Sequence, residues 1–255
     1  MKKNVLFLVM LFAPLRFSQT DSVLSGVYNW SDLDLQVEKT DYFEKRQILE
    51  GSVTDNENLN VYALTIEPGK SLKEKNNEET LIIIKEGEVK ISVKDDNKIL
   101  IPGSIALIMS GDDYEIENSG DKDATYYVFL YKSKYPVDIQ RGIETGGSFM
   151  INWNDLEFHP HDKGGIRQYF NRPTSMAKRF DIHVTNLNAG IKSHEPHTHR
   201  AAEIVLMING NTEMEIGNGL YKGTDGDLYF LGSNVPHAIK NTGTESCIYF
   251  AIQWE

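Results

Sequence analysis

The sequence predicts an all-β protein that folds as two tandem barrels of similar size. Valine, isoleucine, tyrosine, phenylalanine and threonine recur in short runs, and glycine-containing turns separate the runs. Such runs are typical of strands, and no long segment keeps the 3.6-residue period of an amphipathic helix. The 255 residues are enough for one large or two small domains, and an internal repeat favours two.

The repeat relates the two halves of the chain at an offset of 123 residues, which takes Trp30 to Trp153. The same offset relates Gly87 to Gly210, Gly103 to Gly226, Tyr114 to His237, and Asn118 to Asn241. Self-similarity at a fixed spacing indicates two copies of one β-unit. We expect an N-terminal unit over residues 21–135 and a C-terminal unit over residues 136–255, with the linker near Pro136 and the pair Gly146-Gly147.

Side chains that bind metals well gather in the second copy. His197, His199 and Glu203 share one parity, so on an extended strand they would point to the same face. Three hydrophilic groups on an otherwise apolar segment need partners, and one metal ion satisfies all three. A fourth candidate, His237, follows an apolar strand, a Gly-Ser-Asn turn and Pro236.

These two segments resemble the two signature motifs of the cupin superfamily. Gly190, His197, His199, Glu203 and Gly210 match the first motif, with one extra residue before the first histidine, and Gly226, His237 and Asn241 match the second. Gly232 and Asn234 depart from the second motif, because proline and glycine are usual there. The resemblance implies two tandem cupin (double-stranded β-helix, jelly-roll) barrels, a bicupin, and it carries the family's four metal ligands onto His197, His199, Glu203 and His237.

The two copies differ in their chemistry. Every histidine lies in the second copy, and the positions of the first copy that correspond to the ligands hold Glu74, Asn76, Thr80 and Tyr114. One carboxylate is too little for a transition-metal site of the usual kind. We therefore expect one divalent transition metal (Mn, Fe, Zn, Ni or Co) per chain, in the second copy. The first copy is expected to be a degenerate cupin without metal ligands, which is either a structural half or a site for a ligand bound without metal.

His183 is the candidate catalytic residue. It lies on an expected strand on which Phe180, Ile182 and Val184 face the other way. If its own face lines the barrel, His183 can act as a general acid or base beside the metal; the alternative is a half-exposed strand histidine. We expect the strand of His183 to neighbour the strand of the ligands.

Four further residues are weighed as ligand-binding groups. His194 is expected in a loop close to the metal ligands. His159 and His161 flank Pro160 and are expected in a surface loop. Arg167 is placed either to grip an acidic ligand or to form a surface salt bridge.

The function classes that remain open all involve a small molecule. The first hypothesis is a metal-dependent enzyme for a small polar or carboxylated substrate, as a hydrolase, lyase, isomerase or dioxygenase; the alternative is a non-catalytic cupin that binds or senses a small ligand. Among bicupins the chain is distantly similar to the ureidoglycine aminohydrolases, although these use a different ligand set. The formal net charge of −11 and the lack of a basic stripe argue against nucleic-acid binding. A homodimer remains open.

The first 20 residues are typical of a signal peptide. Met1-Lys-Lys-Asn precedes an apolar run from Val5 to Leu15, and a span of the bilayer needs roughly 20 apolar residues. We therefore expect export, to a bacterial periplasm, without a stable membrane anchor. The single cysteine, Cys247, excludes an intrachain disulfide and is expected as a small buried hydrophobic residue in the last strand.

Overall fold

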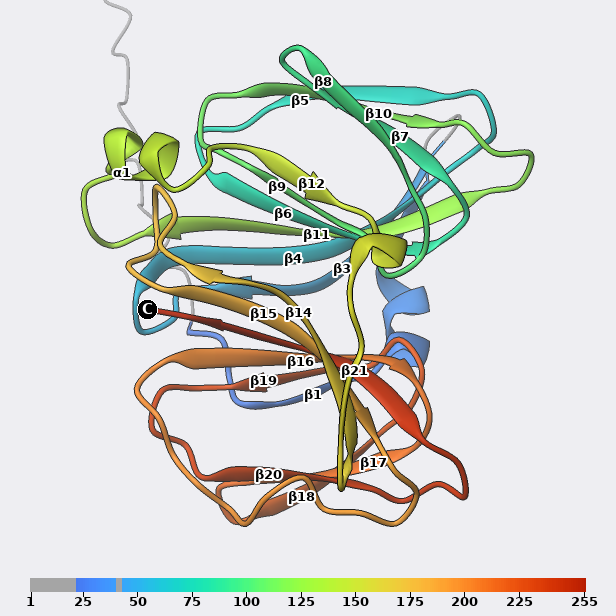
Figure 1. Cartoon of the computed structure of the whole chain (residues 1–255), viewed down its shortest axis with the longest axis vertical. Helices are drawn as coiled ribbons and strands as arrows, with labels where there is room; N and C mark the ends of the chain where they lie inside the picture. The colour runs from blue at the N-terminus through green and yellow to red at the C-terminus, as the bar shows by residue number, and fades with distance from the viewer. Residues whose placement is uncertain (1–21, 40–42) are drawn as a thin grey trace, which may run out of the picture.

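The chain folds into two β-barrels that pack against each other, as Figure 1 shows. The computed structural model describes residues 22–39 and 43–255, so the predicted signal peptide lies outside the described residues. Strands dominate, and the predicted all-β class with two jelly-roll barrels is confirmed. The described residues also form the short helix α1 (Ile139–Glu144) and the 3-10 turns η1 (Trp30–Gln36) and η2 (Trp153–Asp155). None of the described helices is long and apolar enough to cross a membrane.

The first barrel consists of a seven-stranded and a four-stranded antiparallel sheet. The large sheet has the order β12 (Phe149–Ile151), β9 (Ile105–Ile108), β6 (Glu79–Glu86), β11 (Ala124–Ser133), β4 (Asn56–Ile66), β3 (Phe43–Gly51) and β2 (Val37–Lys39). The small sheet has the order β5 (Ser71–Lys75), β10 (Asp113–Asn118), β7 (Val89–Val93) and β8 (Asp96–Leu100).

The second barrel repeats this plan with a three-stranded small sheet. Its large sheet has the order β1 (Gly26–Tyr28), β19 (Leu228–Leu231), β16 (Ala202–Asn209), β21 (Cys247–Trp254), β15 (Phe180–Leu187), β14 (Gly164–Arg172) and β13 (His159–His161). The small sheet has the order β18 (Gly219–Gly223), β17 (Thr212–Ile216) and β20 (His237–Asn241).

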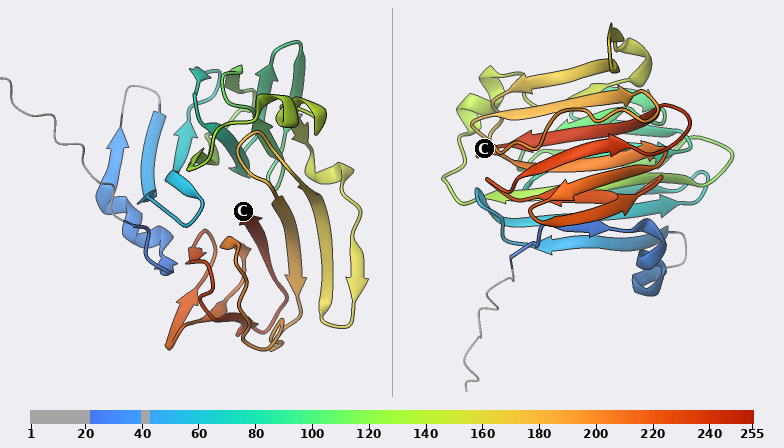
Figure 2. Two further views of the ribbon diagram at one scale, coloured as in Figure 1. Left: turned by 90° about the vertical axis from the view of Figure 1, so that its left-hand side faces the viewer. Right: turned by 90° about the horizontal axis from the view of Figure 1, so that it is seen from below.

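The two large sheets face each other and share one hydrophobic core, and the two views of Figure 2 show their strands stacked in layers. Alternate residues of β6 divide between two cores: Ile83 packs in the core between the barrels and Ile82 inside the first barrel. Strands that are buried on both faces read as continuous apolar runs, as expected for this segment. On β15 the apolar face with Phe180 and Ile182 packs between the barrels, so the opposite face looks into the second barrel.

The barrels exchange their first strands. β1 belongs to the first copy by sequence but pairs with β19 of the second barrel, and β12 belongs to the second copy but pairs with β9 of the first. The repeat-related tryptophans follow: Trp30 packs over Gly226, and Trp153 packs over Gly103. The backbone amide of Trp30 also donates to Oδ1 of Asp227 in the second barrel, and that of Trp153 donates to Oγ of Ser104 in the first. The division of the sequence at residues 135 and 136 stays a prediction, because in space each half completes the sheet of the other.

The departures from the second cupin motif have a physical explanation in this exchange. The amide of Gly232 donates a hydrogen bond of 2.9 Å to Oγ of Ser25, which a proline could not do. Asn234 has a φ of +60°, a left-handed conformation that asparagine tolerates better than most residues. Its amide donates to the carbonyl of His199 over 2.8 Å, so the turn is tied to the neighbouring segment of predicted ligands.

Candidate metal centre and cavity

The four predicted ligands converge in the second barrel. The ligand nitrogens of His197, His199 and His237 all lie within 4.8 Å of one another. Oε2 of Glu203 lies 3.1 Å from Nε2 of His199 and 3.3 Å from Nε2 of His237. Three imidazoles and one carboxylate around a single point form a donor set that suits a divalent transition metal.

The segments that carry these side chains differ from the expectation of one continuous strand. β16 begins only at Ala202, so Glu203 lies on the large sheet while His197 and His199 precede it in a loop. His197 forms an isolated antiparallel bridge with His237, whose strand β20 belongs to the small sheet. The cluster therefore joins the two sheets of the barrel at one end.

The rings of His199 and His237 turn their Nε2 atoms toward the cluster. Nδ1 of His199 lies 2.8 Å from the carbonyl of Ala201, and Nδ1 of His237 lies 2.9 Å from the carbonyl of Val235. A carbonyl only accepts, so each Nδ1 donates, and each Nε2 of a neutral ring keeps a lone pair for the cluster. Nε2 of His237 is buried, and its contact of 3.3 Å with Oε2 of Glu203 is not an aligned hydrogen bond. A metal ion would satisfy this buried nitrogen, so the residues present fit such a group.

The electrostatics of the cluster favour a charged carboxylate. Burial raises the pKa of Glu203, but the imidazoles of His199 and His237 outweigh burial and lower this pKa to about 2. The hydrogen bond to Glu203 raises the pKa of His199. Burial and the neighbouring histidines lower the pKa of His197. Glu203 thus stays ionised at neutral pH and can serve as an anionic ligand.

The cluster opens on a cavity of about 370 Å³ inside the second barrel. His183 lines this cavity, because the apolar face of β15 packs between the barrels instead. Its strand does not neighbour that of Glu203, contrary to the expectation: β21 lies between β15 and β16. The residue of β21 that pairs with both His183 and Val205 is Ala251, whose small side chain leaves room between the two walls.

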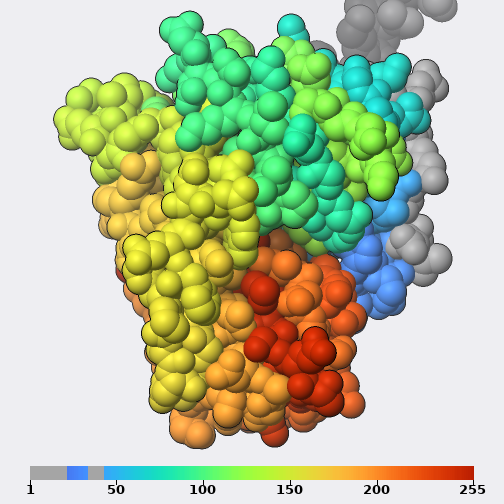
Figure 3. All heavy atoms as spheres, turned by 45° about the vertical axis from the view of Figure 1, so that its right-hand side comes forward, coloured from blue at the N-terminus to red at the C-terminus, as the bar shows by residue number. Residues whose placement is uncertain are grey.

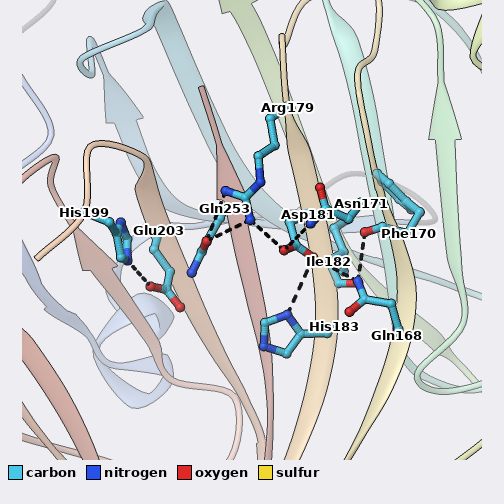
Figure 4. A network of polar contacts seen from close by, with 10 residues as sticks. All are labelled: Gln168, Phe170, Asn171, Arg179, Asp181, Ile182, His183, His199, Glu203 and Gln253. Atoms are coloured by element: carbon cyan, nitrogen blue, oxygen red, sulfur yellow. Dashed lines mark hydrogen bonds and ion pairs between the residues drawn. The ribbon is translucent and has the colours of Figure 1, made fainter. Parts of the chain in front are cut away.

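A polar network holds the carboxylate that lies beside His183, as Figure 4 shows. Nδ1 of His183 lies 3.7 Å from Oδ1 of Asp181, and the other ring nitrogen is turned toward the side of Glu203. Asp181 is itself held, at 2.8 to 3.0 Å, by Gln168, Asn171 and Arg179. Burial raises the pKa of Asp181, but the hydrogen bonds and the neighbouring charges outweigh it, so this pKa is lowered. The imidazole of His183 thus has a fixed anionic neighbour.

Several cavity residues escaped prediction. His161 lies on strand β13 rather than in a loop and lines the cavity, as do Lys163, Ser193 and Tyr249. His194 lies in the loop as expected, with its ring centroid 4.2 Å from that of His197. The glycine pair Gly164-Gly165 after His161 was a hairpin signal that could have placed this segment on the sheet.

Arg167 faces away from the cavity. Its guanidinium stacks on the rings of Trp153 and Phe158, with centroid distances of 4.7 and 4.9 Å. Arg167 therefore packs on Trp153 and Phe158, where the two barrels meet, and does not bind a ligand in the cavity of the second barrel.

Comparison with known proteins agrees with this architecture. The family model described as a cupin domain matches residues 183–253, which contain all four predicted ligands. The match covers the second barrel, and the first barrel repeats the same sheet plan, so the chain has the two-barrel fold of a bicupin. No curated protein matches the sequence.

The solved structures that resemble this bicupin are similar in fold only. A putative glyoxylate-induced protein from Pseudomonas aeruginosa has a TM-score of 0.72 at 14% identity, covering 94% of this chain and 92% of its own. The formate complex of oxalate decarboxylase from Lactobacillus farciminis has a TM-score of 0.70 at 13% identity, covering 91% and 87%. AerE from Microcystis aeruginosa has a TM-score of 0.66 at 16% identity, covering 86% and 96%.

The first barrel of this bicupin holds a hydrogen-bonded group at the positions that correspond to the ligands. The side-chain amide of Asn76 donates to the hydroxyl of Tyr114 over 3.0 Å and to that of Thr80 over 3.4 Å. Tyr114 is buried, and burial raises the pKa of its phenol. These three side chains therefore hydrogen-bond with one another.

A second cavity of the bicupin, of about 410 Å³, lies between the barrels. Its walls are mainly apolar and include Tyr127, Trp153 and Phe250, with Glu86 and Asp225 among the polar residues. Figure 3 shows the two halves meeting along this seam, the green first barrel above the orange and red second barrel. The residues that line it include no histidine, so we place the chemistry in the cavity of the second barrel.

Proposed function

We propose that the second barrel is a metal-dependent enzyme for a small carboxylated molecule, with the metal held by His197, His199, Glu203 and His237. The observation that carries the proposal is the convergence of three imidazoles on Glu203, in which the buried Nε2 of His237 lies 3.3 Å from Oε2 of Glu203 without forming an aligned hydrogen bond. When bound there, a divalent ion of Mn, Fe, Co, Ni or Zn supplies Lewis-acid polarisation or a bound water of lowered pKa.

The residues of the chain supply the proton transfer and its orientation. His183 faces the same cavity as the cluster and is the general acid or base. Asp181 lies 3.7 Å from its Nδ1 and orients the ring, so that the other ring nitrogen serves the substrate. The small side chain of Ala251 gives the substrate its place between the cluster and His183.

The charge of the cavity favours a carboxylated substrate. Glu203 is the only carboxylate among its described lining residues, whereas five histidines and Lys163 also line it. With Glu203 committed to the cluster, the rest of the wall offers cationic and neutral groups to an anion. The similar protein of Lactobacillus farciminis was solved as a formate complex, which is compatible with a small carboxylate in such a barrel.

We further propose that the chain is exported, on the basis of the lysines and the apolar run in residues 1–20. Mass spectrometry of the protein from a cell fraction outside the cytoplasm should give a mature N-terminus close to residue 20. A chain that keeps Met1 in such a fraction would contradict cleavage.

The experiment that tests the enzymatic proposal is a screen of the metal-reconstituted protein against sugar acids, ureides and flavonols. We expect turnover of a carboxylated member, and none with His197→Ala, which removes a ligand from the cluster. Calorimetric titration runs in parallel on the same compounds. Binding without turnover across the carboxylated set would support a ligand-binding cupin and overturn the enzymatic proposal.

A further inference from the structure

Lys163 is a cavity residue that the proposed chemistry does not use. It lies in the turn between β13 and β14, and its Nζ donates to the carbonyl of Ser193 over 2.6 Å. Its own carbonyl accepts from the amide of Asn188 over 2.9 Å. Both ends of the residue are therefore fixed, and the ammonium group is held at the cavity rather than free in solvent.

The glycine after Lys163 makes this placement possible. Gly164 has a φ of +139°, and a Cβ at this position would overlap the carbonyl oxygen of Asn186. Only a glycine lets the turn approach β15 so closely. Gly164 therefore permits the close turn that brings Lys163 to the cavity.

The charge of Lys163 is not compensated by the protein. Among the described residues no aspartate or glutamate forms an ion pair with its Nζ, whose partner is the uncharged carbonyl of Ser193. The nearby Lys192 differs, because its Nζ lies 2.9 Å from Glu215 and 3.6 Å from Glu195. A fixed ammonium without a carboxylate, at the wall of a polar cavity, suits an anionic ligand.

A second unused donor lies beside Lys163. Oγ of Ser193 is buried near Tyr249 without forming an aligned hydrogen bond, and both residues line the same cavity. The amide of Ser193 donates to Ile239, two residues beyond His237 on β20. At the rise of a strand, that places Ser193 about 7 Å along the barrel from the histidine cluster. The lysine and the serine thus mark a position separate from the cluster.

We propose that Lys163 and the hydroxyl of Ser193 form a second anion subsite, and that the substrate is a small diacid. One acidic group lies at the histidine cluster and the other at Lys163 and Ser193. This inference rests on the proposed function, because it names the class of substrate for the same cavity.

The test compares dicarboxylates with matched monocarboxylates by calorimetric titration of the zinc-loaded protein. Succinate and glutarate are measured against butyrate and valerate. We expect the wild type to bind the dicarboxylates at least about tenfold more tightly. Lys163→Gln, which keeps a donor for the Ser193 carbonyl but removes the charge, should lose this preference. Lys163→Arg, which keeps the charge, should retain most of it.

The controls separate this inference from the proposed function and from a structural role. Lys240→Gln changes an exposed lysine of β20 and should keep the wild-type preference. The subsite is overturned if Lys163→Gln keeps the wild-type ratio of dicarboxylate to monocarboxylate affinity, or if the wild type itself shows no preference. In either case a measured zinc content near one per chain leaves the metal centre intact. A wild type that takes up no zinc overturns the proposed function and the subsite with it.

Discussion

Nε2 of His237 lies 3.3 Å from Oε2 of Glu203, and the two residues come from different sheets of the second barrel. A metal ion between them would bind the folded barrel and not the unfolded chain, in which the two residues are separated by 33 intervening positions. We therefore predict one divalent metal per chain and a higher melting temperature with metal than without. At a free concentration one hundred times Kd the gain is about 2.7 kcal/mol, or about 5–10 °C.

Elemental analysis and thermal scans with and without a chelator measure both quantities. A ratio near two metals per chain would show that the first barrel also binds metal. Equal melting temperatures would contradict a metal that joins the two sheets.

The second prediction separates ligands from other histidines. His197→Ala and His237→Ala should each lose most of the bound metal, because each removes one of four donors from the cluster. His159→Ala should keep it, because His159 is exposed on the edge strand β13 and does not line the cavity. Elemental analysis of the three purified variants decides, and full occupancy in His237→Ala would remove His237 from the ligand set.

The third prediction concerns pH. A metal binds neutral imidazole, so it must displace any proton on His199, and the hydrogen bond to Glu203 raises the pKa of His199. Apparent metal affinity should therefore fall as the pH drops through the raised pKa of His199, by about tenfold per pH unit below it for one displaced proton. Competition titrations with zinc at pH 6 and pH 7.5 measure the fall. The same affinity at both values would show that His199 is not protonated in the metal-free protein.

The gathering of the three histidines and Glu203 could be predicted from sequence because its signals are local. His197, His199 and Glu203 lie within seven residues, and the glycines around them mark tight turns such as Gly210, whose φ is +95°. The repeat also predicts equivalent roles for Asn118 and Asn241. The side-chain amide of Asn118 donates to the carbonyl of Ile66 at the end of β4, and that of Asn241 donates to the carbonyl of Leu187 at the end of β15, both over 2.8 Å.

The rest depended on tertiary contacts that no local pattern encodes. β1 and β12 have three residues each, and β1 pairs with a strand about 200 positions away, so their exchange leaves no periodic signal. Lys163 reaches the cavity because it lies in the turn of the edge hairpin β13–β14, which extends the large sheet beyond β15. The distance from His183 to the cluster was underestimated because the last strand, β21, inserts between β15 and β16.

The fourth prediction tests His183. His183→Gln should keep the metal and the melting temperature but lower turnover by roughly 100-fold, the usual scale for a lost general acid or base. His159→Gln changes an exposed histidine outside the cavity and serves as the control. Turnover equal to that of the wild type would reduce His183 to a structural residue.

The last prediction concerns the seam between the barrels, where Trp153 covers Gly103. A Cβ on Gly103 would lie 2.5 Å from Cε3 of Trp153, and the residue has a φ of +87°. Gly190 has a φ of +72°, but a Cβ there would meet nothing within 4 Å. Both alanine substitutions force a left-handed conformation, at about 1–2 kcal/mol, while only Gly103→Ala also displaces the tryptophan, at about 1–3 kcal/mol more.

Urea unfolding of the two variants separates the backbone cost from the cost of moving Trp153. Gly103→Ala should lower the free energy of unfolding by more than Gly190→Ala, and the double variant Gly103→Ala with Trp153→Ala should show coupling between the two sites. The coupling is expected because Trp153 is held in place: its amide donates to Oγ of Ser104 over 3.0 Å, and Arg167 stacks on its ring. If Gly103→Ala and Gly190→Ala lose the same free energy of unfolding, Trp153 moves aside freely. The exchanged segment would then not hold the two barrels together.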